Sequence, residues 1–395
     1  MSPLILLAGG YEGQIHTLSF DPDANPPTLK LTSSAKCGLA PTWLVLSPTS
    51  PTLYVADEWG AGPSVLTSHT ISPSGALTLT SATRSGAAET DEWPCHASLL
   101  LSTAPPRLLV ATYQGCTLSS IPLLATGEFD TTEEGGGRQT ISFLGTGETG
   151  PLAWRQDQDH PHAATVDPTG GFVVVPDLGT DCLKVLRVNA VGDLVRGTDV
   201  ALTAGDGPRH VLFSVLASGE TVLYVLNELS NSISSFAVAY PPTSLFPTFT
   251  PLQSSLSLLP SSPHPHQTDF SSWHAAELKL SRDGRTMIAS NRAEGHDPAN
   301  PPPGAEDVLA LFEVDSRSGT LDQSSRKLVG SGGRAPRHLS LSSERVGAQD
   351  SDMEWVAVAL HDSDEVVISE LAGGELREVV RLKGAGKPAC VLWVN

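Results

Sequence analysis

The sequence has few cysteines and few basic residues. Its five cysteines are odd in number, lie far apart and form no C-x-x-C pair, which argues against a zinc or dithiol site and favours buried thiols. The 24 lysines and arginines are outnumbered by 43 aspartates and glutamates, and the formal net charge is -19. The average surface therefore repels nucleic acids and anionic membranes. An anionic substrate would need a local cluster of arginines and histidines.

Long apolar runs are also missing. No stretch approaches the roughly 18 apolar residues of a membrane-spanning helix. The apolar residues 4–8 near the N-terminus are too few for the core of a signal peptide and have no basic flank. These features predict a soluble, cytoplasmic protein that has neither nucleic acid nor membrane as a partner.

Glycine and proline, by contrast, are abundant. The 36 glycines and 31 prolines are spread along the chain and alternate with runs rich in valine, isoleucine and leucine. This distribution is typical of many short strands joined by turns. The length of 395 residues permits either several domains or one large repetitive domain.

One sequence pattern recurs along the chain. It consists of a proline or histidine, an apolar strand, a Ser-Pro or Asp-Gly turn, and a second apolar strand that ends in a polar residue. The copies are spaced by roughly 50 to 65 residues, near the upper end of propeller periods. Six copies begin at Pro41, Pro94, His160, Pro208, His274 and Pro336.

A seventh copy is divided between the chain ends. Residues 388–394 have the first strand of the pattern, and residues 4–11 supply the second, followed by the alternating residues 14–20. Joining these strands in one blade closes the ring and leaves no long sheet edge. We therefore predict an all-β fold, a single seven-bladed β-propeller over residues 1–395 with four-stranded antiparallel blades. Blade 1 would combine residues 1–36 and 388–395.

Two segments depart from the repeat. Residues 241–272 are rich in proline and serine and interrupt it, so we expect a surface insertion, with a lid over the central pocket as the alternative. Residues 131–137 contain three consecutive glycines but lack the lysine and the following helix of a phosphate loop. A flexible turn is the better interpretation of the second segment.

The repeat places polar residues at one mouth of the channel. In a propeller the first strand of each blade lines the axis. Two positions of each blade therefore lie near the same mouth of the channel: the start of the first strand and the end of the second strand. Buried charges of this kind are costly unless paired, and such clusters often mark catalytic sites. The first position gives His96, His160, His162, Arg209, Glu277 and Arg337, and the second gives Glu58, Tyr113, Asp177, Glu228, Arg292 and His361.

Structural roles are possible for several of these residues. His160 and His162 lie on one face of a strand, but no further ligands stand at a spacing suited to zinc, so we expect neither a metal nor another cofactor. Arg209 and Arg337 could anchor one blade to the next, and Asp177 could accept backbone hydrogen bonds. No G-x-S-x-G motif or convincing Cys/His pair is present, which argues against a covalent nucleophile.

Several short motifs together resemble a known family. In chain order they are Pro94-Cys95-His96, Arg155-Gln156, His160-Pro161-His162, residues 175–179, Gly207-Pro208-Arg209-His210, residues 227–230 and Ser290-Asn291-Arg292. These motifs are similar to those of the seven-bladed lactonases, which include propeller-type 6-phosphogluconolactonases and the fungal carboxy-cis,cis-muconate cyclase. The resemblance covers nearly the whole chain. One departure is Leu360-His361, where family members often carry Asn-Gln.

The resemblance implies a set of functional residues. By their positions in the motifs, His162, Arg209, Glu228 and Arg292 correspond to the residues proposed for catalysis in the cyclase. We expect substrate-binding residues around them, namely His96, Tyr113, His160, Asp177, Glu277 and Arg337. The substrate would be a small anionic lactone or a muconate-type acid.

Two reactions suit this set of residues. In lactone hydrolysis, His162 or Glu228 would be the general base, while Arg209 and Arg292 bind the substrate anion and stabilise the oxyanion. In cyclisation, the arginines would hold the carboxylates of a muconate. The family name favours hydrolysis of a sugar-acid lactone, as in a 6-phosphogluconolactonase.

Two rival functions stay open. A propeller can also be a non-catalytic scaffold for protein partners, because a fold does not determine a function. A calcium-dependent lactonase is the other possibility, and its oxygen ligands would be Glu58, Asp177, Asn227 and Asp362.

Overall fold

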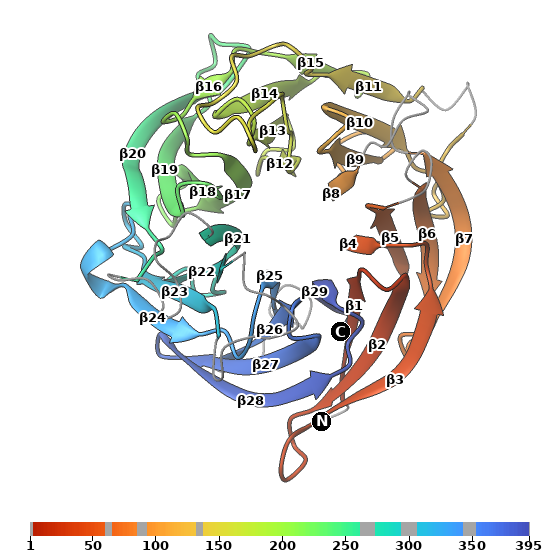
Figure 1. The fold of residues 1–395 in the computed structure, drawn as a ribbon. Coiled ribbons are helices and arrows are strands. Elements are labelled where there is room, and N and C mark those ends of the chain that lie inside the picture. Colours follow the sequence, from red (N-terminus) through yellow and green to blue (C-terminus); the bar gives the residue numbers. More distant parts are fainter. Residues whose placement is uncertain are drawn as a thin grey trace.

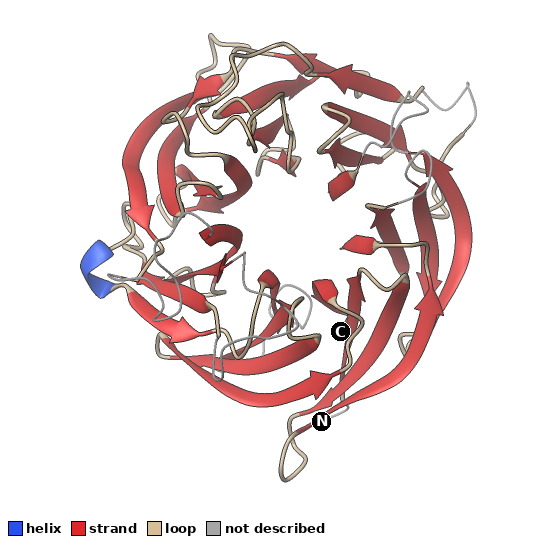
Figure 2. Ribbon diagram, in the orientation of Figure 1, coloured by secondary structure: helices blue, strands red, loops and turns tan. Residues whose placement is uncertain are grey.

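Seven antiparallel sheets form a closed ring around a central axis (Figures 1 and 2). The computed structural model describes residues 3–59, 65–84, 93–131, 137–260, 273–293, 306–342 and 353–394. Within these ranges the secondary structure consists of strands and one short 3-10 helix, Gln323–Ser325. The predicted all-β, seven-bladed propeller is confirmed. None of the described helical structure is long and apolar enough to span a bilayer.

Each of the first four blades runs from a strand at the axis to a strand at the rim. In this order, blade 1 contains β29 (Pro388–Trp393), β1 (Leu4–Gly10), β2 (Gln14–Asp21) and β3 (Thr28–Lys36), and blade 2 contains β4 (Pro41–Leu46), β5 (Thr52–Asp57), β6 (Val65–Ile71) and β7 (Leu77–Arg84). Blade 3 contains β8 (Pro94–Leu100), β9 (Arg107–Thr112), β10 (Thr117–Pro122) and β11 (Gln139–Ser142). Blade 4 contains β12 (Thr165–Val166), β13 (Phe172–Asp177) and β14 (Cys182–Val188), with β15 (Leu194–Arg196) and β16 (Val200–Ala201) both paired to β14.

The remaining three blades follow the same order. Blade 5 contains β17 (Pro208–Val215), β18 (Thr221–Asn227), β19 (Ser232–Ala239) and β20 (Thr248–Ser257). Blade 6 contains β21 (Trp273–Leu280), β22 (Thr286–Ala293), β23 (Val308–Glu313) and β24 (Lys327–Gly330), and blade 7 contains β25 (Pro336–Leu341), β26 (Met353–Leu360), β27 (Glu365–Ala372) and β28 (Glu375–Lys383).

Both chain ends contribute to blade 1, as the sequence predicts. Strand β1 pairs antiparallel with β29, so that Leu6 lies opposite Trp393 and Ala8 opposite Val391. The indole nitrogen of Trp393 donates to the backbone oxygen of Ser340 in blade 7 at 3.1 Å. The pairing of the two ends therefore also joins the last blade to the first.

Apolar side chains fill the spaces between neighbouring blades. Strands near the axis are covered on both faces by adjacent sheets, and every residue of β5 and β18 is buried. Between blades 5 and 6, for example, Leu226 and Tyr224 pack with Met287 and Leu278. Burial of such side chains is the main stabilising contribution in a fold of this kind. It gives the polar mouth of the channel a rigid frame.

Part of the predicted insertion at 241–272 is regular structure. Strand β20 lies inside it and pairs with β19 as the outer strand of blade 5, with Ala239 opposite Thr248 and Ile233 opposite Leu256. Most of β20 is exposed on both faces, so it lacks the apolar alternation that predicts a strand. Residues 261–272, and with them a test of the lid hypothesis, lie outside the described residues, as do residues 132–136 of the glycine-rich segment.

Candidate active site

A bulge at the start of the inner strands directs one side chain per blade toward the channel mouth. In blades 2, 3, 5 and 7 the strand pairing shifts between the initial proline and the second residue after it. Such a shift leaves the intervening residue outside the regular pairing and re-aims its side chain. The intervening residues are Thr42, Cys95, Arg209 and Arg337. All four line one cavity. His162 follows Pro161 in blade 4 and lines the same cavity.

A second group of side chains comes from the residue after each second strand. Glu58 follows β5, Tyr113 follows β9, and Glu228 follows β18, and these three residues line the cavity together with Arg292 near the end of β22. The cavity has a volume of about 350 Å³. The repeat therefore brings residues from blades 2 to 7 to one polar site.

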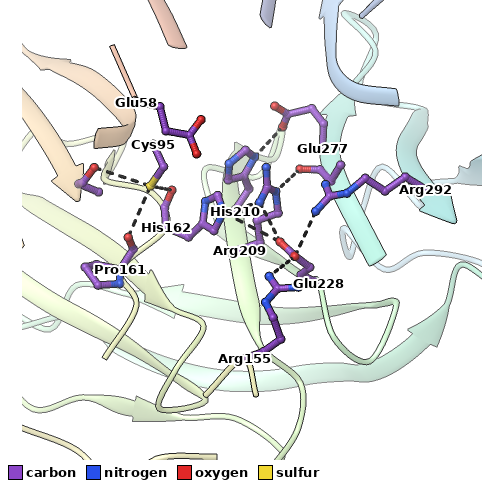
Figure 3. A network of polar contacts seen from close by, with 12 residues as sticks. Glu58, Cys95, Arg155, Pro161, His162, Arg209, His210, Glu228, Glu277 and Arg292 are labelled. Carbon is purple, nitrogen blue, oxygen red and sulfur yellow. Dashed lines mark hydrogen bonds and ion pairs between the residues drawn. The ribbon is translucent and has the colours of Figure 1, made fainter. Parts of the chain in front are cut away.

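Glu228 is the centre of this site (Figure 3). Its carboxylate is fully buried and accepts from Arg155 at 2.5 Å, from Arg209 at 2.8 Å and from Arg292 at 3.1 Å. Burial alone would raise the pKa of Glu228, but the charges of the three arginines outweigh burial and hold the pKa well below its usual range. Glu228 is therefore an ionised carboxylate that fixes three guanidinium groups in place.

His162 lies beside this network. Its Nε2 contacts the guanidinium of Arg209, and its ring stands edge-on to Tyr113 with centroids 5.5 Å apart. Burial, with the positive charge of Arg209, lowers the pKa of His162 well below its ordinary value, so the ring is neutral at pH 7. Because a guanidinium can only donate, Nε2 accepts and Nδ1 carries the hydrogen. Nδ1 is buried and has no hydrogen-bond partner among the described residues.

A different group of side chains lies on the side of blades 7, 1, 2 and 3. Glu58 accepts a hydrogen bond from the phenol of Tyr11 at 2.9 Å, and the guanidinium of Arg337 lies over the Tyr11 ring at 5.4 Å from its centroid. Cys95 lies close to the backbone oxygens of Pro161 and His162. Burial raises the pKa of the Cys95 thiol, so it is protonated at neutral pH.

Four aromatic residues also line the cavity. Trp93 and Trp154 are exposed at 39% and 63% and line the cavity with Tyr113 and Trp43. The guanidinium of Arg155 lies 5.6 Å from the ring centroid of Trp154. Apolar and aromatic walls with a few convergent polar groups are typical of small-molecule sites.

Two of the predicted substrate-binding residues lie elsewhere. His96 and Glu277 line a second cavity of about 610 Å³, together with His210 and His338, and neither lines the cavity that contains Glu228. Glu277 binds His210 at 3.1 Å and lies 3.4 Å from His338. A bulge accompanies the difference in both blades. His96 is the second residue after Pro94, at the end of the shift in pairing, and Glu277 lies within the shift between Ala275 and Leu278 in blade 6.

Trp43 separates the two cavities and lines both of them. Its ring centroid lies 4.4 Å from that of His96, 5.4 Å from that of His210 and 5.2 Å from that of His338. These three histidines come from blades 3, 5 and 7, so the indole occupies the centre of the ring.

His160 and Asp177 have structural contacts rather than positions in the cavity. The His160 ring stacks on Tyr113 with centroids 4.1 Å apart and binds Asp157 at 2.9 Å. Asp177 accepts from the backbone N–H of His160 at 2.7 Å and lies 3.4 Å from the amine of Lys184. Neither residue lines the cavity that contains Glu228.

The sequence pattern did not identify Arg155, Trp93, Trp154 or Cys95 as site residues. Arg155 lies between β11 and β12, in a loop that the strand repeat does not place, although it stands in a family motif shortly before His160. Cys95 directly follows the first proline of its blade, as Arg209 and Arg337 do in their blades. Its offset from the proline is therefore the signal that could have identified it.

The four proposed calcium ligands do not form a site. Asp177 binds the backbone of His160 and the amine of Lys184. The amide of Asn227 donates to Ser232 and Ser234 at 3.0 Å. Asp362 binds His361 at 2.7 Å. Glu58 accepts from Tyr11. In the described ranges, no three His, Cys, Asp or Glu residues are grouped so that they could hold a metal ion.

Two known proteins with similar sequences cover two thirds or nearly all of the chain. A "Probable 6-phosphogluconolactonase" of Arthroderma benhamiae is 27% identical over 392 residues, which are 98% of this chain and 88% of the relative. A "6-phosphogluconolactonase" of Formosa agariphila is 24% identical over 268 residues, covering 66% of this chain and 62% of the relative.

Solved structures show the same fold. The periplasmic gluconolactonase of Pseudomonas aeruginosa matches with a TM-score of 0.75 and 24% identity, covering 100% of this chain and 99% of that one. A protein from Lactobacillus plantarum matches with a TM-score of 0.77 and 22% identity over 100% of both chains. The family model described as "Lactonase, 7-bladed beta-propeller" matches residues 5–393. With this match over almost its full length, the chain belongs to the seven-bladed β-propeller lactonase family.

Proposed function

We propose that this protein hydrolyses a small anionic sugar-acid lactone, of the 6-phosphogluconolactone type, in the cavity around Glu228. The observation that carries the proposal is the grouping of four arginines and two glutamates on that cavity, in a chain with a formal net charge of -19. The cavity thus has a local positive charge that would attract an anion despite the acidic protein. The names of the relatives support the same reaction class.

The arginines have two tasks in this proposal. Arg209 is buried and also contacts His162, and it would stabilise the oxyanion that forms when water attacks the lactone carbonyl. Arg155 and Arg292 would hold the phosphate or carboxylate of the substrate. Glu228 keeps all three guanidinium groups in position before the substrate arrives. Such preorganisation is what makes electrostatic stabilisation effective.

We assign Glu228 and His162 to positioning and binding rather than to proton abstraction. Both oxygens of Glu228 already accept from arginines, and Nε2 of His162 is occupied by Arg209. His162 would instead hold the guanidinium of Arg209 in place through Nε2. Of the other predicted residues, Tyr113 and Arg337 line the cavity and would contact the substrate, while Trp93 and Trp154 would pack against the apolar face of the sugar ring.

Lactone closure of a muconate stays a second prediction, because the same arginines could hold carboxylates. Cytoplasmic localisation also stays a prediction, and one similar solved structure is that of a periplasmic enzyme. The expectation of no nucleic-acid partner rests on the net charge alone.

A direct assay tests the proposed reaction. Purified protein would be mixed with 6-phosphogluconolactone, glucono-lactone or 3-carboxy-cis,cis-muconate, and acid release or absorbance followed after subtraction of the spontaneous rate. We expect turnover of a lactone, retained in the presence of EDTA, and loss of most activity in an Arg209→Ala variant. Turnover of the muconate alone would favour cyclisation, and no turnover above the spontaneous rate for either lactone would refute the proposal.

A further inference from the structure

Glu58 and Glu228 occupy equivalent positions in two blades. In each blade the first proline pairs with the last residue of the second strand: Pro41 with Asp57, and Pro208 with Asn227. The glutamate is the next residue in the chain. The backbone N–H of each glutamate donates to the residue before that proline, in both cases at 2.8 Å. The two carboxylates therefore stand at the same level of the propeller.

They also stand on opposite sides of the axis. Inner strands that follow one another in the sequence are neighbours around the ring, and Glu58 belongs to blade 2 while Glu228 belongs to blade 5. Three blade steps in a seven-bladed ring lead nearly halfway around it (Figure 1). Since both side chains line one cavity, a bound substrate would lie between them.

The surroundings of the two carboxylates differ in charge. Glu228 is fully buried and accepts from three guanidinium groups. The Glu58 carboxylate accepts from the neutral phenol of Tyr11, and one guanidinium, that of Arg337, lies over the ring of that phenol. Glu58 is also partly exposed and lines the cavity. Figure 3 shows it beside Cys95, apart from the arginines that converge on Glu228. One wall is thus arranged to bind anionic oxygen and the other presents an accessible carboxylate.

We propose that Glu58 is the general base of lactone hydrolysis, an inference that rests on the proposed function. The Glu58 carboxylate removes a proton from a water molecule, whose oxygen forms a bond to the lactone carbonyl carbon. The carbonyl oxygen becomes an oxyanion facing the arginines. When this intermediate collapses, the bond from the carbonyl carbon to the ring oxygen breaks, and protonated Glu58 returns its proton to that oxygen. The product is a hydroxy acid, which releases its carboxyl proton to solvent.

The other groups that line the cavity are less suited to this step. Guanidinium groups cannot accept a proton. The Cys95 thiol lies against the carbonyl oxygens of Pro161 and His162, and a protonated thiol is not a base. Nε2 of His162 is directed to Arg209. Glu58 is therefore the group in the cavity whose chemistry and contacts both permit it to accept a proton from water.

Kinetics of Glu58→Gln and Glu228→Gln variants test the inference. We expect Glu58→Gln to lower kcat by about 10²–10⁴ with little change in KM, because a positioned base contributes about this much. The acid limb of the pH–rate profile, which reports protonation of the base, should disappear. Glu228→Gln should instead raise KM strongly, since the arginines would lose their common partner. Formate added to Glu58→Ala should restore part of kcat, which a purely structural role would not allow.

The outcomes separate the two proposals. If wild-type protein shows no lactonase activity, the proposed function fails. If wild-type protein is active but Glu58→Gln, folded by near-ultraviolet circular dichroism, keeps kcat within threefold and retains the acid limb, the assignment of Glu58 is wrong. If Glu58→Gln does not fold, Glu58→Ala with and without formate, or Glu58→Asp, takes its place. Absence of any rescue of kcat by formate, or of any change in the pH–rate profile, would overturn the assignment.

Discussion

Cys95 and His96 are adjacent in the sequence, yet they line different cavities: Cys95 faces the one that contains Glu228, and His96 faces the one beyond Trp43. The bulge after Pro94 causes this separation, because the strand pairing shifts between Pro94 and His96. A substitution at each position should therefore have a different effect on substrate binding.

We expect Cys95→Phe to raise KM by more than tenfold, since a ring in place of the thiol would occupy part of the 350 Å³ cavity. His96→Asn should leave KM within about threefold of wild type, because an amide oxygen can still accept the hydrogen bond that His96 receives from Ala164. Steady-state kinetics with the preferred lactone would measure both. An equal increase of KM in the two variants would contradict the separation of the cavities.

Glu228→Gln should also lower stability. Removing the carboxylate leaves three buried or half-buried guanidinium groups without their common partner. Loss of one member of a buried ion pair costs about 3–5 kcal/mol. Urea unfolding would give the change, with Glu220→Gln on an exposed turn as the control, for which we expect a change below about 0.5 kcal/mol. A Glu228→Gln protein as stable as wild type would show that the network has no structural role.

Acid should destabilise the fold through the histidines around Trp43. Burial lowers the pKa of His338 to about 3, with Glu277 opposing the shift and Lys279 and His210 adding to it. A histidine in the unfolded chain titrates near 6.5. As the pH falls from 6.5 toward 3, the unfolded chain therefore binds a proton that folded His338 does not, and the free energy of unfolding decreases.

For His338 alone the loss between pH 7.5 and pH 5.5 is about 1.4 kcal/mol. Urea unfolding of wild type and His338→Gln at these two pH values would test this. The variant should lose less stability on acidification than wild type does. The same pH dependence in both proteins would exclude His338 as the source.

Closure of the ring depends on the last strand. Trp393 is 1% exposed and packs against Phe20, with ring centroids 6.1 Å apart. Replacing a buried tryptophan with alanine costs about 3–5 kcal/mol, so Trp393→Ala should lower the free energy of unfolding by this amount. Deletion of residues 388–395 should abolish cooperative unfolding, because β1 loses its partner. Leu245→Ala, at a residue 70% exposed, is the control and should have little effect.

Most of the fold could be predicted from the sequence because inner strands are covered on both faces and appear in the sequence as apolar runs. The pairing of residues 4–10 with residues 388–393 followed from counting the repeats. Strand β20 was not predicted, because its exposed faces impose no apolar pattern. An outer strand is held by backbone hydrogen bonds to its neighbour. Every residue supplies a carbonyl acceptor for them, and every residue except proline supplies an N–H donor.

The site was predicted in part. Arg209, Glu228, Arg292 and His162 meet in one cavity because equivalent positions of a repeat converge at the axis. His96 and Glu277 were misplaced, since strand alternation does not reveal a bulge, and a bulge changes the face on which later residues lie. Arg155 was missed for a different reason, because it lies in an irregular loop whose path the repeat cannot specify.

The indole of Trp43 has a consequence for the passage of molecules. It lines both cavities and packs against three imidazole rings, whereas Trp93 and Trp154 are exposed aromatic residues of the cavity that contains Glu228. We therefore expect reactant and product to pass on the side of Trp93 and Trp154. The hydroxy acid formed from a lactone carries one more negative charge than its precursor, and the arginines attract it as it leaves. Acid that accumulates would then occupy the cavity and compete with the lactone for it.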